Sequence, residues 1–270
     1  MNNSIAILGG GNLGQSIAYG LINTQLYPVS KLTITRRKLD GLNDLVDAGI
    51  EVTSNNVEAV KKSAFIFLCV QPKQLKGILE EIGQILDPKK HLLISTITGV
   101  PISEIENVLS PGFPIIRAMP NTAIAIQESM TCLATQSASD EQLNTVKSMF
   151  DKMGSCLIIE EELMAAATVL GASGIAFALR FIRAAAQGGI EMGFDAEEAQ
   201  AIAMQTCRGA ASLLIDSGKH PESEIDRVTT PRGCTIAGLN EMEHNGMSSA
   251  LIKGIVASYR KIANIKKNTP

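Results

Sequence analysis

The sequence predicts an α/β fold, a doubly wound and mostly parallel sheet followed by an all-α C-terminal domain. Three observations predict it. Short β-branched runs alternate with longer amphipathic segments from residue 4 to about residue 160, as in βαβ units. A glycine-rich turn follows the first of these runs. After residue 160 the chain consists of long alanine-rich segments without a further strand candidate.

Eight runs are expected to be strands, and six segments between them are expected to be helices. The run 64–70 is apolar throughout, which fits a strand covered on both faces, so the sheet should lie between two layers of helices. The expected strands are 4–9, 31–35, 50–53, 64–70, 91–96, 113–118, 130–135 and 156–159. The expected helices are 13–23, 38–48, 56–61, 74–85, 102–108 and 140–152.

The second half of the chain reads as helix alone, with segments expected at 162–170, 175–192, 196–216, 233–243 and 248–264. We place the domain boundary between residues 160 and 161, which gives domains 1–160 and 161–270. Residues 175–192 are apolar on most of the helix circumference, as in the centre of a large core or in a subunit interface. Because about 110 helical residues cannot easily supply such a core alone, we favour a homodimer.

Composition limits the class of protein. The 270 residues are 45% hydrophobic and 19% charged, which describes a globular soluble chain. The 24 basic and 27 acidic residues give a net charge of −3, so no overall positive field would hold nucleic acid or an anionic membrane. Aromatic residues make up only 4%, which indicates a core of small and flexible side chains.

Cysteine and histidine usage predicts a reducing compartment and no metal site. An odd count of cysteines without a CxxC pair cannot form a complete disulfide framework, and we expect a cytoplasmic protein. The three histidines lie far apart and none has metal-ligand spacing. The N-terminus lacks a basic signal region, and no uninterrupted apolar stretch reaches the length of a membrane span, so we expect no membrane partner. The cysteines are Cys69, Cys132, Cys156, Cys207 and Cys234.

A dinucleotide fingerprint, G-x-G-x-x-G, stands between the first strand and the first helix. Gly9 should make the tight turn, Gly11 should let backbone N–H groups approach a pyrophosphate, and Gly14 should let the helix pack closely. The alternative is a glycine-rich turn without a ligand. Residues 1–160 are therefore predicted to be a Rossmann-like dinucleotide-binding domain. The run consists of Gly9, Gly10, Gly11, Asn12, Leu13 and Gly14.

The end of the second expected strand predicts the cofactor. Arg36, Arg37 and Lys38 stand there without a carboxylate, which favours NADPH, with NADH as the alternative, because guanidinium groups suit a 2'-phosphate. The helix dipole opposes cations at a helix start, and a bound phosphate would resolve that placement. The competing interpretation is a solvated basic helix start. Asn55 and Asn56, after the third strand, could reach the adenosine ribose or only cap a helix.

Two more segments complete a set of four ordered motifs. The expected sixth strand ends in Arg117, Ala118, Met119, Pro120, Asn121 and Thr122. The helical half contains a Thr-Thr-Pro-Arg-Gly-Cys-Thr segment from Thr229 to Thr235. With the glycine turn and the Val70-Gln71-Pro72 turn, these segments make the chain resemble the pyrroline-5-carboxylate reductase family from Ile5 to about Tyr259.

The resemblance implies a function. Members of this family reduce 1-pyrroline-5-carboxylate to L-proline with NAD(P)H, the last step of proline biosynthesis. They combine a Rossmann domain with a helical dimerisation domain, and the substrate pocket lies at the dimer interface. We therefore expect a homodimer and leave assembly into a higher homo-oligomer open.

The resemblance also assigns roles to residues. Thr235 matches the threonine near the substrate nitrogen, and we expect it to orient that nitrogen or a water, since a threonine hydroxyl is a weak acid. The segment that would hold the substrate carboxylate comprises Thr230, Pro231, Arg232, Gly233, Cys234 and Thr235. The residues that match cofactor contacts are Val70, Gln71 and Pro72, with Met119, Pro120 and Asn121 beside the nicotinamide.

The chain departs from the family pattern at four positions. Gln71 replaces a lysine, Ala123 a frequent proline, Arg232 a glycine and Ile175 a proline. Two other functions remain open. An NADP-dependent 3-hydroxyacid-type dehydrogenase would need a general acid or base such as lysine, but the helix after Gly171 offers only apolar residues up to Arg180. A catalytically silent dinucleotide-binding protein would bind NADPH without turnover.

Overall fold

A computed structural model describes residues 4–265 in two compact units. One unit holds residues 4–173 and 258–265, and the other is Gly174–Ala257. The break between the units therefore follows residue 173, whereas the predicted boundary between residues 160 and 161 stays a prediction. The outer ends of the two predicted domains, 1–3 and 266–270, lie outside the described residues.

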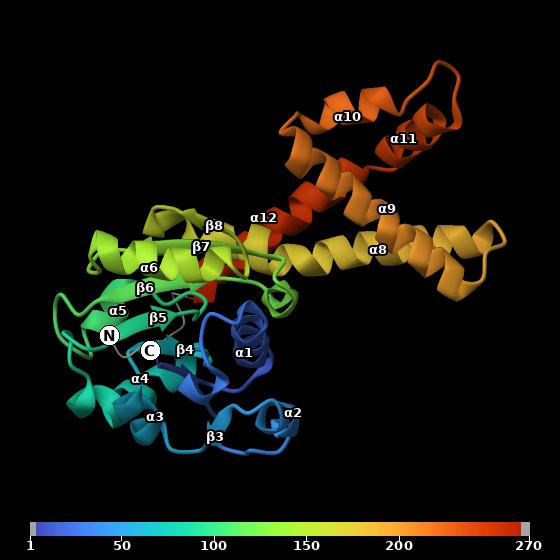
Figure 1. Cartoon of the computed structure of the whole chain (residues 1–270). Coiled ribbons are helices and arrows are strands. Elements are labelled where there is room, and N and C mark those ends of the chain that lie inside the picture. Colours follow the sequence, from blue (N-terminus) through green and yellow to red (C-terminus); the bar gives the residue numbers. More distant parts are fainter. Residues whose placement is uncertain (1–3, 266–270) are drawn as a thin grey trace. The chain divides into compact units, whose positions relative to one another are not determined.

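The first unit is built on an eight-stranded sheet in the order β3-β2-β1-β4-β5-β6-β7-β8 (Figure 1). Neighbouring strands are parallel except β6 and β7. This confirms the predicted doubly wound, mostly parallel sheet. The chain order reverses between β1 and β4, which is where ligands bind in such folds. The strands are β1 Ile5–Leu8, β2 Leu32–Thr35, β3 Glu51–Thr53, β4 Phe65–Leu68, β5 Leu92–Ser95, β6 Ile115–Met119, β7 Ser129–Thr135 and β8 Gly154–Ile158.

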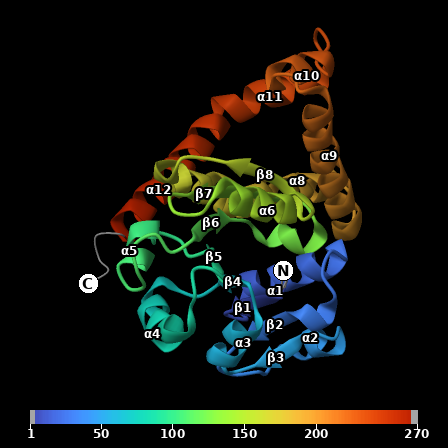
Figure 2. The same ribbon diagram turned by 60° about the vertical axis from the view of Figure 1, so that its left-hand side comes forward.

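Two hydrophobic clusters cover the two faces of the sheet. Ile5 and Ile7 of β1 belong to one cluster, while Ala6 and Leu8 belong to the other, as expected from the alternation of side chains along a strand. Helices α1 (Asn12–Thr24) and α6 (Asp140–Asp151) pack on the first face. The second face carries α3 (Asn56–Lys62), α4 (Pro72–Ile82) and α5 (Ile102–Glu106) (Figure 2).

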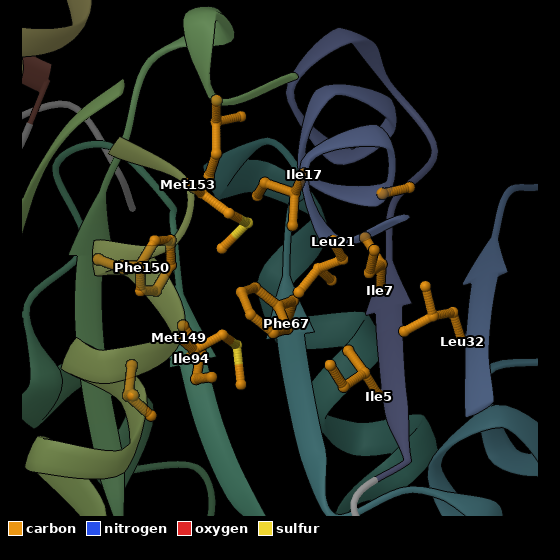
Figure 3. Packing of buried hydrophobic residues seen from close by; sticks show 14 of the residues in the cluster. Ile5, Ile7, Ile17, Leu21, Leu32, Phe67, Ile94, Met149, Phe150 and Met153 are labelled. Carbon is orange, nitrogen blue, oxygen red and sulfur yellow. The ribbon is translucent and has the colours of Figure 1, made fainter. Parts of the chain in front are cut away.

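Aliphatic and methionine side chains fill most of the first cluster, as the low aromatic content predicts. Phe67 and Phe150 are its largest fully buried side chains, and their ring centroids lie 6.1 Å apart at an interplanar angle of 57°. Figure 3 shows Leu21 of α1 and Met149 of α6 beside these rings. The core therefore joins α1 to α6 across the centre of the sheet.

The prediction of a helix at 38–48 is wrong for the first half of that segment. Helix α2 spans only Asn43–Asp47, because Gly41 adopts a left-handed backbone with φ of +82°. Arg36 donates a hydrogen bond from Nη1 to the carbonyl of Asp40 (3.1 Å), which closes the loop before the helix. Arg36, Arg37 and Lys38 therefore lie in a loop. Contrary to expectation, no helix dipole opposes these cations, although their place after β2 is as expected.

The expected helix 162–170 is divided into three short pieces. A 3-10 turn (Glu161–Leu163), helix α7 (Met164–Ala167) and a π-helical segment (Thr168–Ser173) follow one another. The side-chain amide of Asn121 donates to the carbonyl of Gly171 in the π-helical segment (3.0 Å). The end of β6 is thereby tied to a segment of a kind that is frequent at functional sites.

The carboxylate of Glu161 anchors the start of this segment to the sheet. It accepts hydrogen bonds from the backbone N–H of Ile102 (2.8 Å), from Nη1 of Arg117 (3.0 Å) and from Nε2 of Gln136 (2.9 Å). The side chains of Arg117 and Glu161 are 3% and 11% exposed. Removing either partner would leave a charge with little access to water, which is costly.

The second unit is helical. Its elements are α8 (Gly174–Glu191), α9 (Ala196–Ser217), α10 (Pro221–Arg227), α11 (Cys234–His244) and the beginning of α12 (Met247–Ile265). Helices α8 and α9 pack through small residues, and a Cβ on Gly189 would lie 2.9 Å from the Cβ of Ala199. Helix α10 was not predicted, although Pro221 at its first position is a helix-start signal.

Large apolar side chains are exposed on α8 and α9. The run Glu161–Glu191 is also long and apolar enough to cross a membrane by length and composition alone, and little of its most apolar stretch is buried. Such a surface needs a partner of some kind. The exposed residues on these helices include Leu179, Phe181, Ile190, Ile202, Met204, Leu213 and Ile215.

His91, directly before β5, is held as a neutral acceptor. Its Nδ1 accepts a hydrogen bond from the backbone N–H of Asp87 (2.9 Å), and the residue is buried. Burial lowers the pKa of His91 below its ordinary value of 6.5. In the folded state the ring therefore stays neutral to a lower pH than in the unfolded chain.

We predict a pH-dependent stability from this histidine. The stabilisation is complete above the unfolded pKa of about 6.5 and is lost as the pH falls towards the lower folded pKa, because the unfolded chain then binds the extra proton. The urea midpoint of unfolding should decrease as the pH is lowered from about 7.5 to about 5.5. It should decrease less in His91→Gln. Equal slopes in the two proteins would contradict this role.

Candidate active site

A cleft of about 1210 Å³ lies at the carboxyl ends of β1, β2, β4 and β5. This is the crevice at the sheet's switch point, where nucleotides bind in doubly wound folds. The structure brings ten of the predicted cofactor residues together there: Gly9, Gly11, Asn12, Leu13, Arg36, Arg37, Asn56, Val70, Gln71 and Pro72.

The glycine turn after β1 fits a dinucleotide. Gly9 has φ of +115°, and a Cβ on it would lie 2.3 Å from the carbonyl oxygen of Cys69. A Cβ on Gly14 would lie 2.0 Å from the carbonyl oxygen of Gly9, so only glycine lets α1 approach the turn. Nothing lies within 4 Å of a Cβ on Gly11, which leaves room above the turn. The predicted roles of the three glycines agree with this geometry.

The start of α1 is open to an anion. Its N-cap, Gly11, makes no side-chain capping bond, and the first turn contains no acidic residue. Backbone N–H groups at such a helix start attract phosphate through hydrogen bonds and the helix dipole. The charged side chains that line the cleft are Arg36, Arg37, Lys38 and Lys73, with Glu81 as the acidic member. The cleft therefore has more basic than acidic side chains, which suits phosphate groups.

Four predicted cofactor residues do not line the cleft. Gly14 shapes the turn from behind it, while Met119, Pro120 and Asn121 are buried at the end of β6. The Asn121 side chain accepts a hydrogen bond from the backbone N–H of Ala123 (2.9 Å) besides donating to the π-helical segment. These contacts give Asn121 a structural role. Its predicted place beside the nicotinamide stays a prediction.

One face of α4 was missed as part of the cleft. Gln74, Gly77, Ile78 and Glu81 line it, at spacings of three and four residues that place them on one side of a helix. Ser54 also lines the cleft. The spacing was available in the sequence. The prediction considered only the strand ends, whereas a helix that follows a strand end also borders the crevice.

Two side-chain chemistries are disfavoured by the structure. Burial raises the pKa of the Cys69 thiol to about 12, although a hydrogen bond with the Thr96 side chain lowers it in part. The cleft therefore offers no thiolate at this position near neutral pH. Among residues 4–265, no group of three or more histidine, cysteine, aspartate or glutamate side chains could hold a metal ion. The cleft is suited to binding and orienting a cofactor.

The second predicted site is a turn in the helical unit. The backbone N–H of Gly233 donates to the carbonyl of Thr230 (2.9 Å), Pro231 follows Thr230, and Arg232 has φ of +62°. These are features of a type II turn, whose third position favours glycine. A Cβ on Gly233 would lie 2.5 Å from Oγ1 of Thr230, so this glycine is also constrained.

The turn leads directly into α11, whose start is open. Its N-cap, Gly233, makes no side-chain capping bond, and the first turn holds no acidic residue. The N–H groups at Cys234 and Thr235 are therefore placed to receive a carboxylate. Thr235 is half-buried and Cys234 is exposed. The predicted substrate residues thus form one turn and one helix start.

Comparison with known proteins identifies the family. Residues 161–265 match the family "Pyrroline-5-carboxylate reductase dimerisation", and residues 4–99 match "NADP oxidoreductase coenzyme F420-dependent". The chain is 48% identical to pyrroline-5-carboxylate reductase 2 of Dictyostelium discoideum, over 96% of this chain and 92% of that protein. The chain belongs to the pyrroline-5-carboxylate reductase family.

Other members of the pyrroline-5-carboxylate reductase family agree. Reductase 1 of Dictyostelium discoideum is 46% identical over 98% of this chain, which spans 50% of that protein's length. The Coxiella burnetii enzyme is 27% identical, with a TM-score of 0.88 and 98% coverage of both chains. The Plasmodium falciparum structure, with NADP bound, has the same fold at a TM-score of 0.89, 22% identity and 98% coverage of both chains.

Membership of the pyrroline-5-carboxylate reductase family fixes the general activity. The chain is an oxidoreductase with an NAD(P)-binding domain and a helical dimerisation domain, and its reaction belongs to proline biosynthesis. This agrees with the resemblance found in the sequence. The rival dehydrogenase is not supported, because α8 contains no lysine between Gly174 and Glu191.

The positive φ of Arg232 predicts the effect of restoring the family glycine. Arg232→Gly should raise the midpoint of thermal unfolding by about 1–2 °C, because a non-glycine residue in the left-handed region costs about 1 kcal/mol and glycine's unfolded-state entropy offsets part of it. Calorimetry measures the change. Arg232→Val is the matched control and should lower the midpoint, because β-branched residues disfavour this region most. A rise for valine would contradict the account.

Proposed function

We propose that the chain catalyses NADPH-dependent reduction of 1-pyrroline-5-carboxylate to L-proline. The observation that carries the proposal is the open start of α11 behind the Thr230–Gly233 turn, in a chain of this family that also has a dinucleotide cleft. An imine acid needs a site for its carboxylate and a hydride donor. The start of α11 offers the first, and a cofactor bound in the cleft would supply the second. The NADP of the Plasmodium falciparum structure supports the choice of cofactor.

The residues of the chain bind and orient the reactants. The cofactor, when bound, supplies the hydride that reaches the imine carbon, while a proton ends on the ring nitrogen. N–H groups at the start of α1 hold the pyrophosphate, and Arg36 and Arg37 hold the 2'-phosphate. N–H groups at Cys234 and Thr235 hold the substrate carboxylate. The Thr235 hydroxyl orients the ring nitrogen or a water.

The reaction needs no activated nucleophile. A protonated imine is already electrophilic, so positioning supplies most of what the protein must contribute. The raised pKa of Cys69 is consistent with this reaction because no thiolate is required. NADH is the alternative cofactor, since it differs only in lacking the phosphate that Arg36 and Arg37 would hold.

The working form is proposed to be a homodimer in the cytoplasm. The exposed apolar side chains of α8 and α9 lie within the segment that matches the dimerisation family, so a second copy is the partner that accounts for them. Arg180 and Arg183 in α8 count against a membrane as that partner. The odd number of cysteines and the lack of a CxxC pair support a reducing compartment.

Turnover tests the reductase proposal directly. When the purified chain is mixed with NADPH and 1-pyrroline-5-carboxylate, the absorbance of the reduced nicotinamide should decrease and proline should form. A 3-hydroxyacid with NADP should give no reaction. NADPH binding without oxidation would identify a catalytically silent dinucleotide-binding protein and reject the reductase proposal.

The double variant Arg36→Ala with Arg37→Ala tests cofactor choice. We expect the KM for NADPH to rise at least about tenfold and the KM for NADH to stay within about twofold, because hydrogen bonds to charged groups are worth about 1.5–3 kcal/mol and only NADPH carries the 2'-phosphate. Steady-state kinetics with each cofactor measure this. An equal rise for both cofactors would remove the phosphate assignment.

Thr235→Ala tests the role of the hydroxyl. We expect kcat to fall about tenfold, because one orienting hydrogen bond is worth roughly 1–1.5 kcal/mol. Thr235→Ser keeps the hydroxyl and should retain most of the rate. If Thr235→Ala turns over as fast as the unchanged protein, the residue has only a structural role.

Sedimentation tests the proposed dimer. The unchanged chain should sediment as a dimer or a larger homo-oligomer, and Leu179→Glu should shift it towards monomer, because this exposed side chain would place a charge in an apolar interface. Glu197→Gln, at the start of α9, serves as a control and should leave assembly unchanged. A fully active monomer would contradict the dimer.

A further inference from the structure

Three side chains from three elements form a hydrogen-bonded row in the nucleotide cleft. Thr35, the last residue of β2, donates from Oγ1 to Oδ1 of Asn56 (2.6 Å). Asn56, the first residue of α3, donates from Nδ2 to Oε2 of Glu81 (2.8 Å). Glu81 lies near the end of α4. All three residues line the cleft, so the row runs along its wall.

The bonds fix the orientation of Asn56 and define what the row offers a ligand. The amide oxygen of Asn56 is occupied by the Thr35 hydroxyl, which sets the direction of the amide group. Within residues 4–265, Glu81 Oε1 and the second N–H of Asn56 have no hydrogen bond to the chain. The row therefore presents one free carboxylate oxygen and one free N–H in the cleft.

The position of the row indicates which group of a ligand the free carboxylate oxygen would bind. In dinucleotide folds an acidic residue at the end of the second strand accepts a hydrogen bond from the ribose 2'-hydroxyl of NAD, and basic residues there accommodate the phosphate of NADP. Here the strand ends in Thr35 and is followed by Arg36, Arg37 and Lys38. The carboxylate of Glu81, on α4, is linked to the same strand end by its hydrogen bond with Asn56, which is bonded to Thr35. Groups suited to both cofactors thus border one cleft.

We propose that Glu81 is a specificity-determining residue that limits the preference for NADPH over NADH. Its free oxygen accepts a hydrogen bond from the ribose 2'-hydroxyl of NADH, and its charge repels the 2'-phosphate of NADPH. Arg36 and Arg37 act in the opposite direction. The inference rests on the proposed NAD(P)H-dependent function and adds a carboxylate to its cofactor recognition.

The variant Glu81→Gln removes the charge and keeps the length and shape of the side chain. Its amide oxygen can still accept from Asn56, so the row stays in place. Dissociation constants for NADPH and NADH are measured by titration calorimetry without the imine substrate. We expect NADPH to bind about threefold more tightly and NADH about threefold more weakly, modest changes because Glu81 is exposed to solvent. The NADPH preference then rises about tenfold.

Glu80→Gln is the matched control. Glu80 is the adjacent residue on α4, is exposed and does not line the nucleotide cleft. Its Oε1 lies 4.0 Å from Nζ of Lys76. Replacing Glu80 removes the same charge from the same helix as replacing Glu81. We expect it to leave the ratio of the two dissociation constants unchanged. A change as large as that of Glu81→Gln would make the effect one of overall charge and overturn the proposal.

Two further results would also overturn the role of Glu81. They are an equal change in both dissociation constants, which would mean that Glu81 contacts a group common to both cofactors, and no change in either constant. Because binding is measured without the imine, a chain that binds both cofactors without turnover would reject the reductase function and still test Glu81. The two proposals can therefore fail separately.

Discussion

The close approach of α1 to the turn after β1 is the constraint on which the candidate site depends. A Cβ on Gly14 would lie 2.0 Å from the carbonyl oxygen of Gly9, and one on Gly9 would lie 2.3 Å from the carbonyl oxygen of Cys69. Backbone atoms block both positions, so a side chain there could not be accommodated by a rotamer change. The turn holds the start of α1, the end of β2 and the end of β4 around one crevice. The proposed contacts to the pyrophosphate and the 2'-phosphate are placed by that arrangement.

Anion binding in this chain is proposed to be local. The net charge of −3 gives no overall attraction for phosphate or carboxylate. Two helix starts without side-chain caps, at α1 and α11, supply N–H groups instead, and Arg36 and Arg37 add charge at the cleft. The scarcity of aromatic residues fits this picture, because backbone donors and close-packed small residues hold small ligands without stacking.

The sequence predicted the sheet well because six of its eight strands are largely buried and apolar, and buried strands leave a strong pattern. It failed where backbone conformation decides the outcome. The apolar pattern continues through residues 38–48, but Gly41 with positive φ ends the loop that precedes α2. The hydrogen bond from Asn121 to Gly171, across 50 residues, accompanies a π-helical segment that no local pattern announces.

The candidate site was predictable to the extent that its residues follow strand ends. Gly9, Arg36, Asn56 and Val70 were found because the carboxyl ends of parallel strands meet at one edge. The spacing of Glu81 on α4 places it on the cleft, but its hydrogen bond to Asn56 is a tertiary contact that no local pattern shows. The turn at Arg232 shows the converse. The departure from the family glycine was visible in the sequence, but its meaning required the φ of +62°.

The most direct test of the glycine turn is the NADPH dissociation constant of Gly11→Ala, measured beside its free energy of unfolding. A Cβ on Gly11 meets nothing within 4 Å in the protein, and its φ of −81° suits alanine. The account predicts unchanged stability, within about 0.5 kcal/mol, and NADPH binding weakened at least about tenfold, because the methyl group would occupy the space of the pyrophosphate. Unchanged NADPH binding would contradict the placement of the cofactor at this turn.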